Sequence, residues 1–316
     1  MRDAPRQGRS RRGGADIRQR GDGRLYNGIG AGLVRLLVPG GYWRFVLLCL
    51  CCAGCQSDTQ QAIAYRLDDS YRAAGVDERI HFLVLHYTAE DFDGSLATLT
   101  AGGVSAHYLV PLANGSDHRV PRVYRLVDES RRAWHAGESG WRGRSRLNDT
   151  SIGIEIENAG YRRGLTGFRA APYPPEQIAV VIALCRDIIN RYHIAPYNVV
   201  GHSDIAWRRK QDPGPLFPWR QLAEAGVGVW PKRQRVIYYL AGRAPHAAVP
   251  MAGILERMAR YGYDVTPGMS EALQQRAVAA FQMHFRPGDF RGRPDAETEA
   301  ILDALLEVAP ADGGGG

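Results

Sequence analysis

The middle of the chain carries four short apolar patterns that predict β-strands. HFLVLHY (81–87) is continuously apolar, as a strand buried on both faces would be, whereas VSAHYLV (104–110) alternates more loosely. SIGIEIEN (151–158) alternates strictly, with isoleucines on one face and two glutamates on the other. YNVV (197–200) is a short strand that leads to His202. Together these segments predict a central sheet.

Helical spacing dominates the rest of the chain. Residues 176–193 place apolar side chains at i, i+3, i+4 and i+7 behind two prolines, which predicts an amphipathic helix with Cys185 in its core face. Four more helices are expected at 232–241, 250–261, 270–285 and 295–308. The expected fold class is therefore α/β, a mixed central β-sheet flanked by helices and followed by a small all-α domain.

The first 55 residues have the character of an export leader. An apolar stretch of roughly ten residues follows Arg44, which is too short to cross a bilayer and suits a signal-peptide core. It ends in CAGC (52–55), which resembles the lipobox of bacterial lipoproteins, so Cys55 is the expected lipidation site. The resemblance implies a periplasm-facing, lipid-anchored protein, at the outer membrane because Gln56 is not Asp. A plain secretory signal is the alternative.

The net charge of +7 is confined to this leader. Residues 1–55 hold ten of the 40 Lys and Arg residues and three of the 33 Asp and Glu residues, so the remainder is neutral. A nucleic-acid footprint therefore loses its support, and no obligatory protein partner is evident. Four of the five cysteines also lie in the leader. With Cys55 acylated, only Cys185 would remain, and the mature chain would have no internal disulfide.

Two histidines and one carboxylate stand where a metal site would need them. His86 comes near the end of an apolar strand, at the sheet rim where open α/β folds place their sites. Asp212 follows His202 by ten residues and precedes a Pro-Gly turn. Two imidazoles and one carboxylate without a cysteine make the ligand set of a catalytic zinc, which keeps its fourth position open. Histidine and aspartate near a turn are common, so spacing alone leaves a structural explanation open.

Five ordered motifs carry a resemblance to a known family. LVLHYTA, VSAHYLV, RRAWHAG, NDTSIGIEIEN and VVGHSDIAWRRKQDPG resemble the zinc-dependent N-acetylmuramoyl-L-alanine amidases of the AmpD/AmiD type. The resemblance implies hydrolysis of the amide between N-acetylmuramic acid and the L-alanine of the stem peptide in peptidoglycan or muropeptides. The family usually has proline where this chain has Trp207, a departure that leaves every chemical position intact.

The resemblance assigns a role to each candidate residue. His86, His202 and Asp212 would bind Zn²⁺. Glu155 would be the catalytic base, and the ammonium of Lys210 would stabilise the developing oxyanion.

Four further residues are expected at or near the substrate. The resemblance places His107, Trp134 and His135 along the substrate groove, where an indole beside imidazoles suits a sugar. Core packing of Trp134 is the alternative. Glu157 is expected to be a neighbour of the site.

The end of the chain carries a second resemblance. AVAAFQMHFRPGDFRGRPDAETEAILDALL (277–306) is similar to a three-helix peptidoglycan-binding module, which would concentrate an enzyme on its polymer. The expected layout is a signal and lipoprotein leader at 1–55, a tether at 56–79, a zinc amidase domain at 80–228, a small all-α three-helix domain at 229–309 and a disordered tail at 310–316.

Two other functions stay open at this point. Relatives on such a fold recognise peptidoglycan without cleaving it, typically after losing a zinc ligand, so a non-catalytic peptidoglycan-recognition lipoprotein is the chief alternative. The presence of Glu155, Lys210 and the full ligand set favours an enzyme. A zinc peptidase acting within the stem is disfavoured because no HExxH helix occurs.

Overall fold

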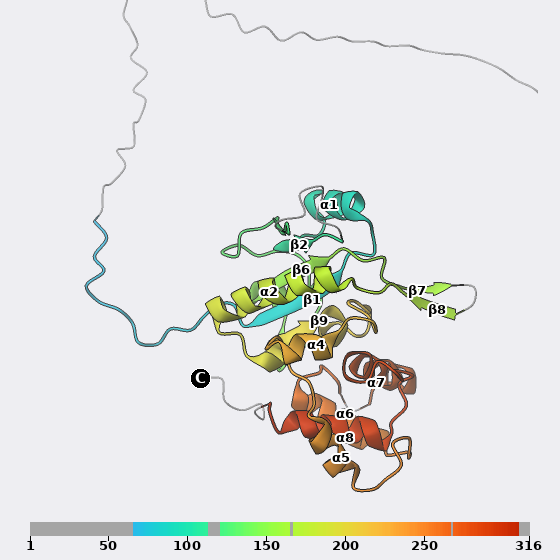
Figure 1. Ribbon diagram of the computed structural model, residues 1–316. Coiled ribbons are helices and arrows are strands. Elements are labelled where there is room, and N and C mark those ends of the chain that lie inside the picture. The colour runs from blue at the N-terminus through green and yellow to red at the C-terminus, as the bar shows by residue number, and fades with distance from the viewer. Residues whose placement is uncertain (1–65, 113–120, 165–166, 267, 310–316) are drawn as a thin grey trace, which may run out of the picture. The chain divides into compact units, whose positions relative to one another are not determined.

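The structure is a computed structural model (Figure 1). It describes residues 66–112, 121–164, 167–266 and 268–309. The chain divides into two compact units, Met1–Asp69 and Ser70–Gly316, and every helix and strand described below lies in the second. Residues 66–79 are exposed and form no helix or strand. The expected leader with Cys55 and the tail at 310–316 lie outside the described residues.

A five-stranded mixed sheet forms the centre of the second unit. Its strands run in the order β3 (Tyr124–Arg125), β2 (Tyr108–Val110), β6 (Ser151–Ile156), β1 (Phe82–Tyr87) and β9 (Val199–Gly201). β1 pairs in parallel with β6 and β9, β2 pairs in parallel with β6, and β3 is antiparallel to β2. The four expected strands are thus neighbours in one sheet, although the second begins only at Tyr108.

One face of the sheet packs against helix α2 (Pro175–Tyr192). Ile178, Val181, Cys185 and Ile188 line the buried side of this helix and contact the isoleucines of β6 through one hydrophobic cluster. Burial raises the pKa of the Cys185 thiol, so the thiol stays protonated. The prediction of a core cysteine is confirmed.

The opposite face packs against the C-terminal helices. Alternation along β1 sends Leu83 and Leu85 toward α2 and sends Phe82 and Val84 into a second hydrophobic cluster. The four helices expected beyond residue 228 contribute to this cluster: α5 (Arg233–Leu240), α6 (Met251–Tyr261), α7 (Glu271–Phe285) and α8 (Ala296–Leu306). Figure 1 shows them gathered on the side of the sheet where β9 lies. Residues 229–309, the helical region, therefore form a layer over the sheet.

Shorter elements join these layers. They are α1 (Phe92–Thr100), the hairpin strands β4 (Gly140–Trp141) and β5 (Arg144–Ser145), the hairpin strands β7 (Tyr161–Gly164) and β8 (Gly167–Ala170), the turns η1 (Leu147–Asp149) and η2 (Pro196–Asn198), and the helices α3 (His202–Ile205) and α4 (Trp219–Glu224). Among the described residues, no helix has both the length and the apolar character that crossing a bilayer requires.

Candidate active site

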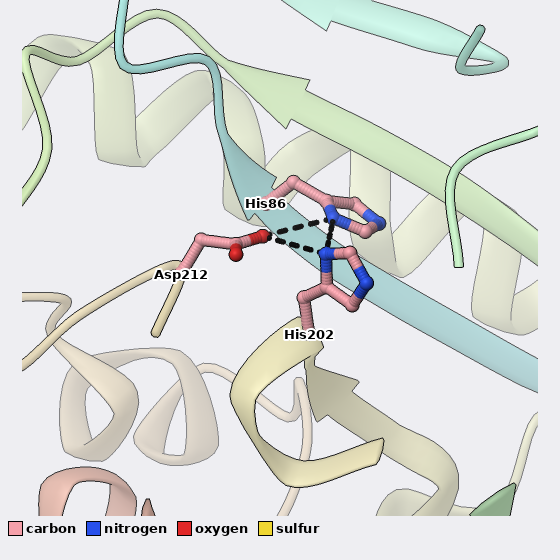
Figure 2. A group of neighbouring side chains, drawn as sticks. All are labelled: His86, His202 and Asp212. Atoms are coloured by element: carbon pink, nitrogen blue, oxygen red, sulfur yellow. Dashed lines mark hydrogen bonds and ion pairs between the residues drawn. The ribbon is translucent and has the colours of Figure 1, made fainter. Parts of the chain in front are cut away.

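Three side chains from separate elements meet at one edge of the sheet (Figure 2). His86 lies near the end of β1, His202 begins α3, and Asp212 lies in the loop that follows. The Nδ1 atoms of His86 and His202 are 2.9 Å apart, and each lies 3.0 Å from Oδ2 of Asp212. All three side chains are buried. Three possible metal-binding atoms therefore converge away from bulk water.

Strand order explains this convergence. β6, β1 and β9 are adjacent and parallel, so their carboxyl ends meet at the same edge of the sheet. His86 is paired in register with Glu155 of β6, and Gly201 at the end of β9 directly precedes His202. Alternation puts His86 on the same face of β1 as Phe82, away from α2.

A closed loop returns Asp212 to the histidines. The amide of Ser203 donates to the carbonyl of Asp212 at 2.8 Å. Gly201 is required where the loop begins, because a Cβ there would lie 2.7 Å from Cδ of Pro213. The segment 201–214, called the ligand loop below, therefore holds two of the three cluster residues and Lys210 in one compact turn.

The hydrogen bond behind His202 fixes its tautomer. Nε2 of His202 lies 3.1 Å from the carbonyl oxygen of Ala136, which can only accept, and 3.4 Å from the guanidinium of Arg209, which can only donate; the shorter contact puts the proton on Nε2. Nδ1 then presents its lone pair to the centre of the cluster. Asn148 supports this contact, because its Oδ1 accepts from the amides of His135 and Ala136 at 3.1 and 2.7 Å.

A relay of three groups does the same for His86. The hydroxyl of Ser151 donates to the carbonyl of Leu147 at 2.6 Å, so its oxygen accepts from Nε2 of His135 at 3.2 Å. Nδ1 of His135 then accepts from Nε2 of His86 at 3.0 Å. Nδ1 of His86 is left unprotonated. Hydrogen bonds behind imidazoles commonly orient metal ligands in this way.

Glu155 lies in a cavity beside the cluster. The cavity has a volume of about 170 Å³, and Glu155 and Lys210 line it together with His202 and Asp212. Oε2 of Glu155 is buried and has no hydrogen-bond partner in the described structure. Burial and the nearby Asp212 raise the pKa of Glu155 to about 8, while Lys210 acts in the opposite direction. A carboxyl group whose pKa lies near neutral pH can both take up and release a proton.

The charge states of the cluster favour a cation. Burial and the neighbouring His202 lower the pKa of His86 to about 4. Burial alone would raise the pKa of Asp212, but the two imidazoles lower it well below its usual range. At neutral pH the cluster thus offers a neutral imidazole beside an ionised carboxylate, the forms in which these groups bind metals.

The donor set fits Zn²⁺. At metal–ligand distances of about 2.0–2.1 Å, tetrahedral ligands lie roughly 3.3 Å apart. The observed separations of 2.9–3.0 Å require only a small outward movement. A second group, His246, Asp289 and Asp295, does not fit, because Arg291 lies 2.6 Å from Asp289 and Arg286 lies 2.7 Å from Asp295. These cations already neutralise both carboxylates.

The three residues expected in the substrate groove differ in their positions and contacts. The side chain of Trp134 is 52% exposed and lines the cavity, and the guanidinium carbon of Arg132 lies 4.2 Å from the centroid of its ring. The core-packing alternative is therefore wrong. His135 also lines the cavity, but both of its ring nitrogens contact His86 and Ser151. It therefore supports His86, and its nitrogens are not free for a sugar.

The placement of His107 in the groove is wrong. Its ring is fully buried, Nδ1 accepts from the amide of Gly153 at 3.0 Å, and Nε2 lies 3.2 Å from the carbonyl of Arg131. No ring atom is left to face a ligand. Glu157 accepts from the amide of Leu112 at 2.6 Å and does not line the cavity, in keeping with a neighbouring position.

Two supporting residues were missed in the sequence. Asn148 and Ser151 both lie within the NDTSIGIEIEN motif, where only the glutamates were given roles. Their contacts reach residues 135 and 136, which no local spacing rule connects to them. Because polar residues at or just before the start of a strand usually serve as turn or cap residues, the identity of these two residues alone carries no sign of this role.

Comparison with known proteins identifies the family of this chain. Residues 76–215 match the family model of N-acetylmuramoyl-L-alanine amidase. The chain is 54% identical over 268 residues to N-acetylmuramoyl-L-alanine amidase AmiD of Escherichia coli, which covers 84% of this chain and 97% of that protein.

Solved structures give the same result. E. coli AmiD in complex with the substrate anhydro-N-acetylmuramic acid-L-Ala-D-γ-Glu-L-Lys matches with a TM-score of 0.75 and 57% identity, over 77% of this chain and 95% of that one. AmpDh3 of Pseudomonas aeruginosa matches with a TM-score of 0.71 and 44% identity, over 77% and 98%. Since the identity to AmiD extends over 84% of this chain and 97% of that protein, the chain belongs to the N-acetylmuramoyl-L-alanine amidases, hydrolases of the amide between N-acetylmuramic acid and the L-alanine of the stem peptide.

Proposed function

We propose that this amidase is zinc-dependent, with His86, His202 and Asp212 as the metal ligands and muropeptides as substrates. The observation that carries the proposal is the buried triangle of two Nδ1 atoms and one carboxylate oxygen, at 2.9–3.0 Å, beside a carboxylate oxygen without a partner. An anhydro-muramyl peptide is the substrate bound to AmiD, and the same class of molecule is proposed here.

Zinc in such a site lowers the pKa of a bound water and polarises a carbonyl oxygen. Glu155 is proposed as the base that takes the water proton and passes it to the departing amine of L-alanine. Its burial and raised pKa suit both halves of that transfer. Proton transfer by a positioned side chain typically contributes 10²–10⁴-fold in rate.

Lys210 is proposed to stabilise the negative charge that develops on the carbonyl oxygen. It lines the same cavity as Glu155 and lies two residues before Asp212 in the ligand loop. A cation held in a rigid loop needs little reorganisation as the charge forms. Trp134, half exposed at the same cavity, is proposed to contact the sugar.

The test is mass spectrometry of anhydro and reduced muropeptides after incubation with the zinc-loaded chain, beside a Glu155→Ala variant. Free stem peptide beginning with L-alanine is expected from the wild type and not from the variant. Relative yields would rank the two muramyl forms. Bound zinc with intact muropeptides would refute the mechanism and support a recognition protein.

The cellular place of the enzyme is proposed from the leader alone. We infer lipidation at Cys55 and a periplasm-facing, outer-membrane position, because CAGC closes the apolar stretch and Gln56 follows. Labelling of cells with a fatty-acid analogue is expected to mark the wild type and not Cys55→Ser. Equal labelling of both proteins would contradict the inference.

A further inference from the structure

A buried carboxylate joins the ligand loop to the helical region. Asp204 is 1% exposed and lies two residues after His202. Within the loop, its Oδ2 accepts from the amide of Gly201 at 2.7 Å. From outside the loop, Tyr263 donates its hydroxyl to Oδ1 at 2.6 Å, and Nδ1 of His284 lies 2.8 Å from Oδ2. Two of the three donors to Asp204 therefore belong to the helical region.

Both outer donors are themselves held in place. Tyr263 and His284 are buried. The ring of His284 stacks on Trp219 with the ring centroids 3.9 Å apart. Burial and Asp204 raise the pKa of Tyr263 well above its usual value, so its hydroxyl remains a donor. The carboxylate of Asp204 is thus fixed by groups that have little room to move.

A second set of contacts lies three and four residues further along the loop, at Trp207 and Arg208. Nε1 of Trp207 donates to the carbonyl of Asp264 at 3.2 Å, and Arg208 forms an ion pair with the Asp264 carboxylate at 3.0 Å. The guanidinium of Arg276 donates back to the carbonyl of Arg208 at 2.7 Å. Trp207, the residue that departs from the family motif, is therefore a second buried contact between the ligand loop and the helical region.

The loop held in this way carries most of the proposed chemistry. His202, Lys210 and Asp212 all belong to it, and only four of its residues form a helix. Its inner side faces His86 and the cavity, while residues 204, 207 and 208 face the helical region. Small displacements of catalytic groups cost much of the activity of a site. Contacts to the outer side of the ligand loop therefore affect the positions of the side chains on its inner side.

We propose that the helical region is a positioning element of the active site, in which Tyr263 and His284 act through Asp204 to hold the ligand loop in its metal-binding shape. This role is distinct from binding peptidoglycan. The part that concerns zinc rests on the proposed function above, whereas the part that concerns loop order does not.

The experiment compares Tyr263→Phe with Tyr261→Phe in the full-length chain. Both tyrosines are buried in the same hydrophobic cluster, but only the Tyr263 hydroxyl bonds to the ligand loop in the described structure. Zinc affinity is measured by chelator competition, and amide hydrogen exchange is measured over residues 201–214. Tyr263→Phe is expected to lower zinc affinity about tenfold, as lost support behind metal ligands does, and to speed exchange in the loop. Tyr261→Phe is expected to match the wild type in both measurements.

A second pair of variants tests the other donor. His284→Asn keeps an N–H donor near the position of Nδ1, whereas His284→Leu removes it. His284→Asn is expected to keep the zinc affinity and the amide exchange rates of the wild type. His284→Leu is expected to lower zinc affinity and to speed exchange over residues 201–214. Folded Tyr263→Phe and His284→Leu proteins with wild-type exchange over 201–214 would overturn the proposal. A wild-type chain that binds no zinc would instead refute the proposed metal site, while the exchange data would still decide whether the helical region orders the loop.

Discussion

Burial of Glu155 opposes ionisation of its carboxyl group, and this effect on the free energy of unfolding is measurable in the metal-free protein. The pKa of this carboxyl is raised to about 8, so the folded state holds its proton more tightly than the unfolded chain does. Stability from this group is complete below its ordinary pKa and is lost as the pH rises toward about 8. We expect the free energy of unfolding to fall over this range by up to about 1.4 kcal/mol per pH unit from this group.

Glu155→Gln is the matched test of this effect. The amide cannot ionise, so the variant is expected to gain stability relative to the wild type as the pH rises from about 5 to about 8. Urea unfolding of both proteins in the presence of a chelator gives the comparison. A stability difference that stays constant with pH would contradict the raised pKa.

At Ser151, one hydroxyl sets the direction of the relay behind His86. Ser151→Ala leaves Nε2 of His135 without its acceptor, so His135 no longer prefers the tautomer that accepts from His86. Zinc affinity is expected to fall about tenfold. Ser95→Ala is the control, because Ser95 is also buried and its hydroxyl donates to a backbone carbonyl, that of Asp91, outside the relay. Equal affinities for the two variants would show that the relay does not orient His86.

These residues also mark how far sequence reasoning reaches at this scale. His86, His202 and Asp212 were identified by a motif whose chemistry is local to strand ends and one loop. His107 and His135 lie in equally good motifs, yet His107 is fully buried with both ring nitrogens bonded to backbone groups, and His135 supports His86. The orientation of a buried imidazole depends on hydrogen-bond partners far along the chain. The spacing of histidines in the sequence therefore cannot predict that orientation.

At the scale of the strand, Gly153 makes room for a ring. A Cβ at this position of β6 would lie 2.4 Å from Cγ of His135, so Gly153→Ala must displace that imidazole. We expect a loss of about 1–3 kcal/mol in stability, as overpacking typically costs. Zinc affinity should fall with it, because His135 supports His86. Gly103→Ala, where a Cβ meets nothing within 4 Å, is the control for thermal unfolding and chelator competition.

The longer elements were predictable because each carries its own pattern. Helix α2 and strand β6 have apolar spacing that only one secondary structure satisfies, and both formed where expected. The hairpins β4–β5 and β7–β8 were missed, since strands of two to four residues are too short to show a period. The packing of α6 and α7 against the sheet was also missed, because the apolar face of a helix does not indicate which surface it packs against.

For the whole molecule, the sheet and the helical region depend on each other. Phe82 and Val84 on the strand and Trp207 on the ligand loop share one hydrophobic cluster with α6 and α7. A chain ending at Gly228 would expose that entire face to water. We expect this fragment to be insoluble or to lose cooperative thermal unfolding, and to bind zinc weakly. A soluble fragment that unfolds cooperatively and binds zinc like the full chain would show that the helical region is an independent appendage.

The alternation along β1 has an evolutionary consequence. Positions 82, 84 and 86 face the helical region and the site, whereas positions 83 and 85 face α2. Inserting or deleting one codon before His86 would exchange the two sets, burying the imidazole under α2 and turning a leucine toward Asp212. Substitutions within one set change only one layer. We therefore expect the length of this strand to stay fixed among descendants of this gene, even where its individual apolar residues drift.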